Sequence, residues 1–292
     1  MPRSVNEFGL ISKYFVPLTN ACVGALELTD DAALVSHEQG YEIVVTCDAL
    51  VSGVHFRNED TPEDVAARAL RVNLSDLAAM GARPISYLLS LAAPADLTET
   101  WLERFVGQLA SDQKTYGLNL IGGDTVFTPG PLTLTITALG QILEGQALTR
   151  AGSKAGDKVF VSGSIGGASL GLRLLHGEFD TLTRAQAAEL KTCFLRPSPR
   201  VGLGQALVGT AHAATDVSDG LVADVGHICA PAGMGAHLNI SSIPLSNATR
   251  AALDMVPDLL PELLSSGDDY ELVFTAPAGE RDALSAISSS TG

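Results

Sequence analysis

The residues of this chain best suited to do chemistry are aspartates that lie beside apolar segments and small residues. The six that fit this description are Asp31, Asp48, Asp76, Asp124, Asp216 and Asp219. Asp48 and Asp124 follow predicted strands, and side chains at strand ends converge on clefts. Each aspartate taken alone is more simply explained as a helix cap or a turn residue. Together they predict a site rich in carboxylates.

Asp76 is the hardest of these aspartates to explain as a cap. It lies late in a predicted helix, three residues after Asn73, so the two side chains share a helix face. A buried carboxylate without a partner would be costly or protonated. Magnesium or calcium would remove that conflict, because these cations take oxygen ligands from protein side chains.

The charge of the chain limits what its site can bind. The formal net charge is -15, and the absence of any Lys/Arg cluster argues against a nucleic-acid partner. An acidic site holds a polyphosphate only when divalent cations lie between the two negative groups. The chain has no GxxxxGK[ST] phosphate loop, no GxGxxG after a strand, no HExxH and no GxSxG. Since phosphoryl transfer needs positioning and charge neutralisation above all, the residues indicate a metal-dependent, phosphate-handling enzyme.

The elements that must position these residues divide into two predicted domains, 1–147 and 148–292, around a polar, glycine-rich segment at 145–157. The mixed order of elements predicts two α+β domains and argues against a doubly wound sheet. We expect strands over 41–47, 85–93, 119–122, 132–142, 158–162, 236–240 and 270–275. We expect helices over 7–15, 61–80, 98–116, 167–176, 183–195, 202–209, 219–229 and 278–288.

The location expected for this chain is the cytoplasm. No apolar run reaches the roughly 18 residues needed to span a bilayer, and the N-terminus lacks the pattern of a secretory signal. The cysteines Cys22, Cys47, Cys193 and Cys229 lie far apart, which is typical of reduced thiols.

Eight segments of the chain resemble, in order, the motif series of the thiamine-monophosphate kinase family. They are DDAA at 30–33, VTCDALVSGVHF at 45–56, VNLSDLAAMGA at 72–82, IGGDT at 121–125, ALTR at 147–150, LRPSPR at 195–200, DVSDGL at 216–221 and SGDDYEL at 266–272. One such segment would be weak evidence, but eight at matching intervals over nearly the whole chain are specific.

The resemblance implies an architecture and a reaction. The architecture is that of the aminoimidazole ribonucleotide synthetase-like superfamily, with an N-terminal α/β domain whose sheet pairs with a second subunit and a C-terminal α+β domain. The implied site holds ATP and several Mg²⁺ ions at the cleft between the domains of a homodimer. The implied reaction is direct transfer of the ATP γ-phosphate to thiamine phosphate, giving thiamine diphosphate with no phosphoenzyme.

The resemblance also implies a role for individual residues. The metal-ligand positions are matched by Asp31, Thr46, Cys47, Asp48, Asp76, Asp124, Asp216 and Asp219, where Cys47 would act through its backbone. The nucleotide-contacting positions are matched by Gly123, Arg150 and Ser218. The substrate-contacting positions are matched by His55 and Asp268. Without the resemblance, Arg150 would be a solvated surface arginine and His55 a partly buried structural histidine.

The chain departs from the family pattern at three places. The family usually has Gly-Ile-Gly where this chain has Glu27-Leu28-Thr29, which affects how closely the backbone can approach phosphate there. Asp268 stands where Glu is common. The family also extends past the position of residue 292 with a tail that supplies an aromatic residue near the thiamine rings.

Two other classes of protein are alternatives to the kinase interpretation of this sequence. A sister enzyme such as selenophosphate synthetase would need a reactive cysteine in a glycine-rich N-terminal loop, which the context of Cys22 does not provide. A hydrogenase-maturation protein would need a C-terminal cysteine tail. The second class is a non-catalytic dimer that keeps the scaffold and binds nucleotide or metal without turnover.

Overall fold

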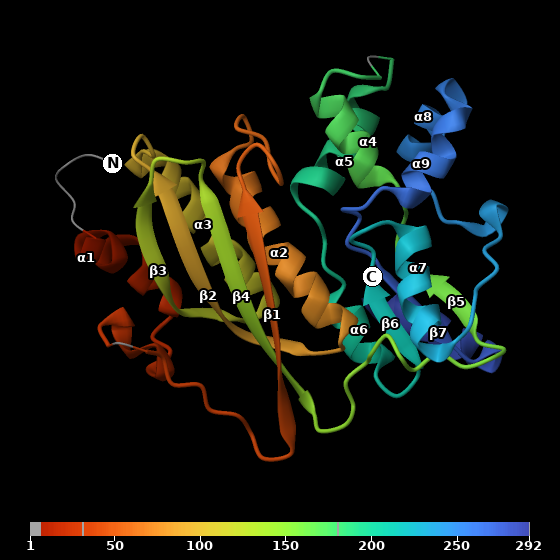
Figure 1. Ribbon diagram of the computed structural model, residues 1–292, viewed down its shortest axis with the longest axis horizontal. Helices are drawn as coiled ribbons and strands as arrows, with labels where there is room; N and C mark the ends of the chain where they lie inside the picture. The colour runs from red at the N-terminus through yellow and green to blue at the C-terminus, as the bar shows by residue number, and fades with distance from the viewer. Residues whose placement is uncertain (1–6, 31, 180, 292) are drawn as a thin grey trace. The chain divides into compact units, whose positions relative to one another are not determined.

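A computed structural model describes residues 7–30, 32–179 and 181–291 (Figure 1). The chain divides into two compact units. The N-terminal unit comprises Met1–Leu77 and Arg83–Glu144, and the C-terminal unit comprises Ala78–Ala82 and Gly145–Gly292. Each unit combines helices with a sheet in which antiparallel pairing predominates, which confirms the predicted α+β class.

The N-terminal unit is built on a four-stranded sheet of order β1-β4-β2-β3. Strand β4 runs antiparallel to both of its neighbours, and β2 and β3 are parallel. The strands are β1 (Tyr41–Val51), β2 (Arg83–Pro94), β3 (Asn119–Thr128) and β4 (Thr133–Leu143). Figure 1 shows the two long helices, α2 (Pro62–Ala79) and α3 (Glu99–Tyr116), together behind the sheet.

Local sequence signals explain where these helices begin and end. Helix α2 starts at Pro62 after Thr61, and its first turn carries acidic side chains that suit the positive helix N-terminus. Helix α3 begins after Thr98, whose side chain accepts a hydrogen bond from the backbone N–H of Trp101. It ends at Gly117 in the left-handed conformation, with φ 72.

One face of the N-terminal sheet is buried and the other is more open. Along β2, Tyr87, Leu89 and Leu91 are fully or almost fully buried, whereas the alternating residues Leu88 and Ser90 are only half-buried. Strand β4 alternates in the same way. Successive side chains of a strand point to opposite faces, so the buried set packs beneath the helices. The alternation predicted for 132–142 is confirmed.

The first 22 described residues form short helical pieces. The helix predicted over 7–15 is present as α1 (Glu7–Leu10) followed by a π-helix, η1 (Ile11–Phe15). Two 3₁₀ helices follow, η2 (Val16–Thr19) and η3 (Val23–Leu28). Leu10, Tyr14 and Phe15 are buried, so these pieces are held by apolar contacts.

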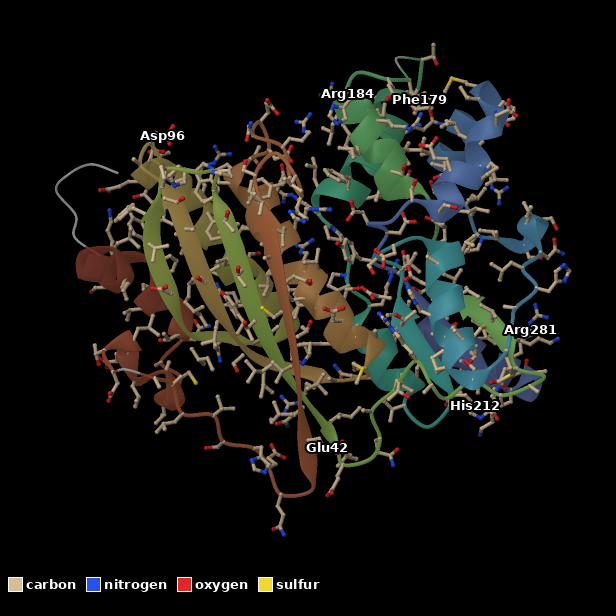
Figure 2. The ribbon with its side chains drawn as sticks, in the orientation of Figure 1. Glu42, Asp96, Phe179, Arg184, His212 and Arg281 are labelled. Carbon is tan, nitrogen blue, oxygen red and sulfur yellow. The ribbon has the colours of Figure 1, made fainter. Side chains whose placement is uncertain are left out.

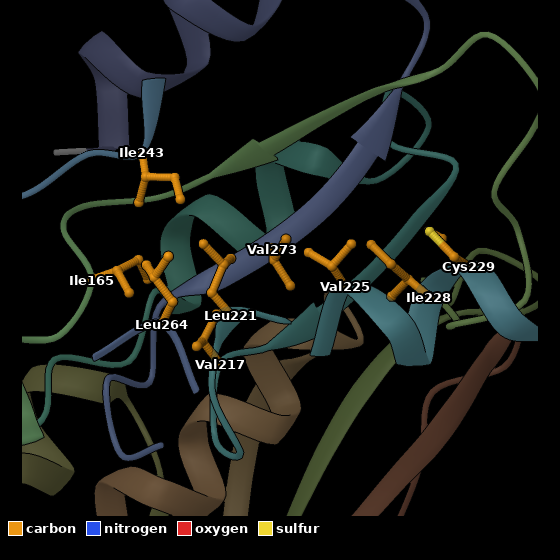
Figure 3. Close-up of a cluster of buried hydrophobic side chains, with 10 residues drawn as sticks. Ile165, Val217, Leu221, Val225, Ile228, Cys229, Ile243, Leu264 and Val273 are labelled. Carbon is orange, nitrogen blue, oxygen red and sulfur yellow. The ribbon is translucent and has the colours of Figure 1, made fainter. Parts of the chain in front are cut away.

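The C-terminal unit contains a three-stranded antiparallel sheet of order β5-β7-β6. Its strands are β5 (Lys158–Val161), β6 (Ala213–Asp216) and β7 (Leu272–Ala276). Its helices are α4 (Gly167–Leu175), α5 (Arg184–Leu195), α6 (Val201–Leu207), α7 (Leu221–Cys229), α8 (Asn247–Met255), α9 (Leu260–Ser265) and α10 (Arg281–Thr291). Figure 3 shows one of its cores, in which Leu221, Val225 and Ile228 of α7 lie beside Val273 of β7.

Several elements of the C-terminal unit differ from the prediction. The strand predicted over 236–240 is wrong, because this segment has no strand partner among the described residues and ends in a 3₁₀ turn, Ile240–Ser242. The side chain of Asn239 accepts from the backbone N–H of Ser241 and so favours that turn. Strand β6 and helices α8 and α9 were not predicted from the sequence.

Two strands of the N-terminal unit are longer than predicted. The predicted strand over 41–47 continues to Val51, and the one over 119–122 continues to Thr128. Asp48 and Asp124 therefore lie within strands, so the prediction that they stand at strand ends is wrong. Their side-chain directions are consequently set by strand alternation.

No helix in the described part of the chain is both long enough and apolar enough to cross a membrane.

Candidate active site

A group of polar side chains joins β1 to α2 in the N-terminal unit; we call it the N-terminal acidic cluster, and it consists of Thr46, Asp48, Asn73 and Asp76. Thr46 and Asp48 are two apart on β1, so they face the same side of the sheet. Asn73 and Asp76 are three apart on α2 and share a helix face. The Thr46 hydroxyl donates to Oδ2 of Asp76 at 2.5 Å, and the backbone N–H of Asp48 donates to Oδ1 of Asn73 at 3.1 Å.

The electrostatics of this cluster favour a bound cation. Burial raises the pKa of the Asp48 carboxyl, and the nearby Asp76 carboxylate raises it further, whereas His55 acts in the opposite direction. The two carboxylates therefore oppose each other's ionisation when no cation is present. The donor set consists of carboxylate, hydroxyl and amide oxygens, which are the ligands that magnesium and calcium prefer. These residues fit a hard divalent cation.

Cys47 lies between two members of the cluster but on the other face of β1. It is exposed, it pairs with Thr137 of β4, and the Thr137 hydroxyl lies 3.3 Å from its sulfur. The side chain of Cys47 therefore points away from Thr46 and Asp48. A contribution of Cys47 to an ion beside those two residues is available only from its backbone.

Asp124 and Gly123 line a separate cavity of about 680 Å³ in the N-terminal unit. Asp124 pairs with Ser90 of β2, and Asp30, Ser90 and Thr135 also line this cavity. A Cβ atom added at Gly123 would lie 1.8 Å from the backbone oxygen of Leu89, so no larger residue fits there. The neighbouring candidate ligand Asp31 lies outside the described residues.

The segment before this aspartate pair has an unusual backbone. Leu26, Glu27 and Leu28 have φ angles of 50, 56 and 55, a left-handed region that glycine adopts far more easily than other residues. This is the segment in which Glu27-Leu28-Thr29 replaces the glycine-rich pattern. The chain adopts a glycine-like conformation here without glycine, which costs conformational energy.

His55 is exposed in the loop after β1 and its ring is oriented by the backbone. Its Nδ1 accepts a hydrogen bond from the N–H of Val51 at 3.0 Å. A neutral imidazole that accepts at Nδ1 carries its proton at Nε2. The Nε2–H is thus the group that His55 offers to a ligand. The guanidinium of Arg68 donates to the backbone oxygen of His55 at 3.0 Å and holds the loop in place.

In the C-terminal unit, the loop after β6 and the loop before β7 are hydrogen-bonded to each other and bring predicted site residues together. Asp216 is buried at the end of β6, and Ser218 and Asp219 follow it before α7. The backbone N–H of Asp268 donates to the backbone oxygen of Ser218 at 3.0 Å. A Cβ added at Gly267 would lie 1.8 Å from that same oxygen, so this close approach requires glycine.

The two remaining predicted residues of this unit are Arg150, which is exposed, and Asp268, which is half-buried. Arg150 Nε donates to the Thr215 hydroxyl at 3.2 Å, next to Asp216. The Tyr270 hydroxyl donates to Oδ1 of Asp268 at 3.2 Å. Asp268 has φ 72, so its backbone is in the left-handed region as well. The fixed cation of Arg150 suits a phosphate oxygen.

Three charged residues within the recognised motifs received no role from the sequence, although the structure gives them partners. Asp269 accepts from the backbone N–H groups of Gly166 and Ala168 at the start of α4, at 2.7 and 3.2 Å. Burial raises the pKa of Asp269 to about 7, against the opposing effect of those two N–H groups. Arg200 makes two hydrogen bonds of 2.6 Å to Glu271. Their position in LRPSPR and SGDDYEL was the only signal in the sequence.

The chain matches known protein families over most of its length. Residues 29–142 match the family described as "AIR synthase related protein, N-terminal domain", and residues 154–292 match its C-terminal counterpart. The "Thiamine-monophosphate kinase" of Caulobacter vibrioides is 40% identical over 289 residues, which are 98% of this chain and 81% of the relative.

Solved structures agree with the sequence comparison. The thiamine-monophosphate kinase of Stenotrophomonas maltophilia K279a is 43% identical, with a TM-score of 0.85, over 98% of this chain and 90% of the other. The structure called "AaThiL complexed with AMPPCP and TMP" is 31% identical, with a TM-score of 0.78, over 94% of this chain and 85% of the other. The acidic motifs, the two-unit architecture and this similarity along nearly the whole chain lead to one conclusion. The chain belongs to the thiamine-monophosphate kinase family.

Proposed function

We propose that this chain transfers the γ-phosphate of ATP to thiamine phosphate, giving thiamine diphosphate and ADP. The observation that carries the proposal is that the chain is identical to thiamine-monophosphate kinases at about two residues in five over nearly its full length. A relative of the same family has been solved as a complex with AMPPCP and TMP, an ATP analogue and a candidate acceptor. The kinase reaction predicted from the motifs is confirmed at the level of the family.

Magnesium is the divalent cation we propose for this reaction. The oxygen donors of Thr46, Asp48 and Asp76 fit it, and Asp124 and Asp216 are further proposed ligands. Asp31, Cys47 (through its backbone) and Asp219 complete the proposed set. When bound, the cations would neutralise charge on the phosphate oxygens of ATP.

The protein residues position the two substrates. Gly123 lies in the lining of the 680 Å³ cavity and offers its backbone to a nucleotide, Arg150 offers a permanent positive charge, and Ser218 offers a hydroxyl beside Asp219. His55 presents Nε2–H and Asp268 a carboxylate to thiamine phosphate. These groups bind and orient the two substrates. We therefore expect them to accelerate the reaction by holding the substrates close together and by neutralising charge.

A homodimer is part of the proposal. The less buried face of the N-terminal sheet includes Cys47, Ser90 and Thr135, and β1 and β3 also expose Val45, Val126 and Phe127. Apolar side chains exposed on a sheet are typical of surfaces that bind another protein. We propose that the N-terminal unit binds ATP and magnesium and forms the dimer, and that the enzyme works in the cytoplasm.

The experiment that tests the function is a product assay. Purified protein is incubated with ATP, Mg²⁺ and thiamine phosphate, and thiamine diphosphate is measured by chromatography. We expect product that depends on both ATP and the metal. The absence of product under conditions in which the Caulobacter vibrioides relative is active would refute the proposed reaction for this chain and favour a binding role.

A further inference from the structure

The loop between α9 and β7 has an unusual backbone conformation around Asp269. The residues on either side of it, Asp268 and Tyr270, have φ angles of 72 and 50, a left-handed region that residues other than glycine rarely adopt. Such conformations persist only where the surrounding structure fixes them, and they cluster at functional sites. Asp268 is the residue to which a contact with thiamine phosphate is assigned above. Whatever fixes this loop therefore also fixes that carboxylate.

Backbone hydrogen bonds tie the loop to the segment after β6. The N–H groups of Asp268 and Tyr270 donate to the backbone oxygens of Ser218 and Val217, at 3.0 and 2.9 Å. The Tyr270 hydroxyl also donates to Oδ1 of Asp268 at 3.2 Å. These bonds hold the two left-handed residues and leave the residue between them to make a different attachment.

The side chain of Asp269 ties the loop to a second element, the start of α4. Its Oδ2 accepts from the backbone N–H of Gly166 at 2.7 Å, and its Oδ1 accepts from that of Ala168 at 3.2 Å. Gly166 is the N-cap residue of α4 and has no side chain with which to cap the helix. Asp269 takes that place from 103 residues further along the chain. The positive end of the helix dipole favours a carboxylate there.

We infer that Asp269 is a positioning residue, which binds the start of α4 and so holds the Asp268 carboxylate where it meets thiamine phosphate. The role rests on the kinase reaction proposed above. Both carboxylate oxygens of Asp269 accept from backbone N–H groups, so its own part is to hold the loop. The adjacent Asp268 then contacts the substrate.

The alternative is that Asp269 only caps α4. A helix cap contributes to the stability of the fold and has no preference between the two substrates. Loss of the Asp269 carboxylate would then lower the free energy of unfolding and leave the KM for thiamine phosphate and the KM for ATP unchanged.

The test is a double-mutant cycle in the kinase assay, made of Asp268→Ala, Asp269→Asn and the variant that carries both changes. Asp268→Ala should raise the KM for thiamine phosphate about tenfold or more, since it removes a hydrogen-bonding charged group. Asp269→Asn keeps one oxygen that can accept and displaces Asp268 without removing it, so we expect a rise of about threefold to tenfold. The kcat and the KM for ATP should stay nearly unchanged, because the contact is present in the ground state and the transition state alike.

The cycle separates positioning from a purely structural role. If Asp269 acts through Asp268, Asp269→Asn should raise the KM for thiamine phosphate no further in a chain that already carries Asp268→Ala. The matched control is Asp258→Asn, an exposed aspartate of the same unit, which should change neither KM. Asp269→Ser keeps a hydroxyl that can cap a helix, and it replaces Asp269→Asn in the cycle if the asparagine variant does not fold.

Three results would overturn the role of Asp269. They are an unchanged KM for thiamine phosphate in Asp269→Asn, an equal rise in KM for both substrates, and full additivity with Asp268→Ala. A different failure is the absence of thiamine diphosphate with the original protein. That result would refute the kinase reaction itself, and the role of Asp269 would fall with it.

Discussion

Replacing Asp76 with Asn is the sharpest test of the N-terminal acidic cluster. Asn has nearly the same shape and keeps an oxygen that can accept from the Thr46 hydroxyl, which lies 2.5 Å from Oδ2 of Asp76. The substitution removes one negative charge beside Asp48, whose pKa is raised by burial and by Asp76. Without metal, we therefore expect Asp76→Asn to be as stable as the original protein or more stable.

With magnesium the expected effect has the opposite sign. A cation present at 100 times its dissociation constant stabilises the folded state by about 2.7 kcal/mol. If the lost carboxylate weakens binding 100-fold, the stabilisation at the same concentration falls to about 0.4 kcal/mol. Turnover should fall about 10²–10³-fold, the usual effect of losing one group that stabilises charge in the transition state. That loss corresponds to about 3–4 kcal/mol of barrier.

The two effects are measured on the same preparation. Urea unfolding with and without Mg²⁺ gives the stabilisation by metal, and chromatographic detection of thiamine diphosphate gives turnover. The control is Asp96→Asn, an exposed aspartate in the loop between β2 and α3 (Figure 2), which should change neither quantity. Near-normal turnover of Asp76→Asn, or unchanged stabilisation by Mg²⁺, would refute the assignment of Asp76 as a ligand.

Three further substitutions test other parts of the site. His55→Ala should raise KM for thiamine phosphate about tenfold or more and leave KM for ATP nearly unchanged, because it removes the Nε2–H donor; equal losses for both substrates would contradict its role. Cys47→Ser should leave the Mg²⁺ dependence of turnover unchanged, since the side chain points away from Thr46; a large increase in the Mg²⁺ requirement would contradict a backbone role. For Asp269 the folded state holds a proton that the unfolded chain releases, because its pKa rises from 3.8 to about 7. Its contribution to stability therefore falls as the pH rises from about 4 to about 7, and Asp269→Asn should flatten that decline in urea unfolding; an unchanged slope would show that the carboxyl is not buried in solution.

Elements with strong local signals could be predicted from the sequence. Thr98 and Gly117 mark the ends of α3, and both caps are present in the structure. The Thr-apolar alternation of β4 is long enough to show its period and its half-open face. In these cases each residue favours the same local structure as its neighbours, so the tertiary fold has little to override.

Elements that depend on distant partners could not be predicted in this way. Strand β6 is a four-residue segment, Ala213–Asp216, with no alternation and two alanines, and it forms because it pairs with β7. The segment at 236–240 has a strand-like sequence but finds no partner strand in the described residues. Strand formation requires pairing, and a single segment carries little information on its partner.

For the site, the sequence predicts the chemistry, but it does not predict the contacts between distant side chains. Residue types and order identified the family and its kinase reaction, and the comparisons confirm both. The roles of individual residues stay predictions, as does the division of labour between the domains. Arg200 and Glu271 are 71 residues apart in sequence, and no local sequence pattern predicts that they pair.

Strand alternation points the side chains of the motif TCD at 46–48 to two opposite faces of the sheet, which the letters of the motif alone do not show. Thr46 and Asp48 face α2, where the Thr46 hydroxyl donates to Asp76, whereas Cys47 faces the other side and lies beside Thr137. Only the backbone of Cys47 is available to the cluster, and every residue type offers the same backbone carbonyl. Under the proposed backbone role, Cys at this position therefore offers the same ligand as the Thr or Ser that the resemblance leads us to expect. The role proposed for Asp48 has no such freedom, because the group that Asp48 offers on the α2 side is its carboxylate.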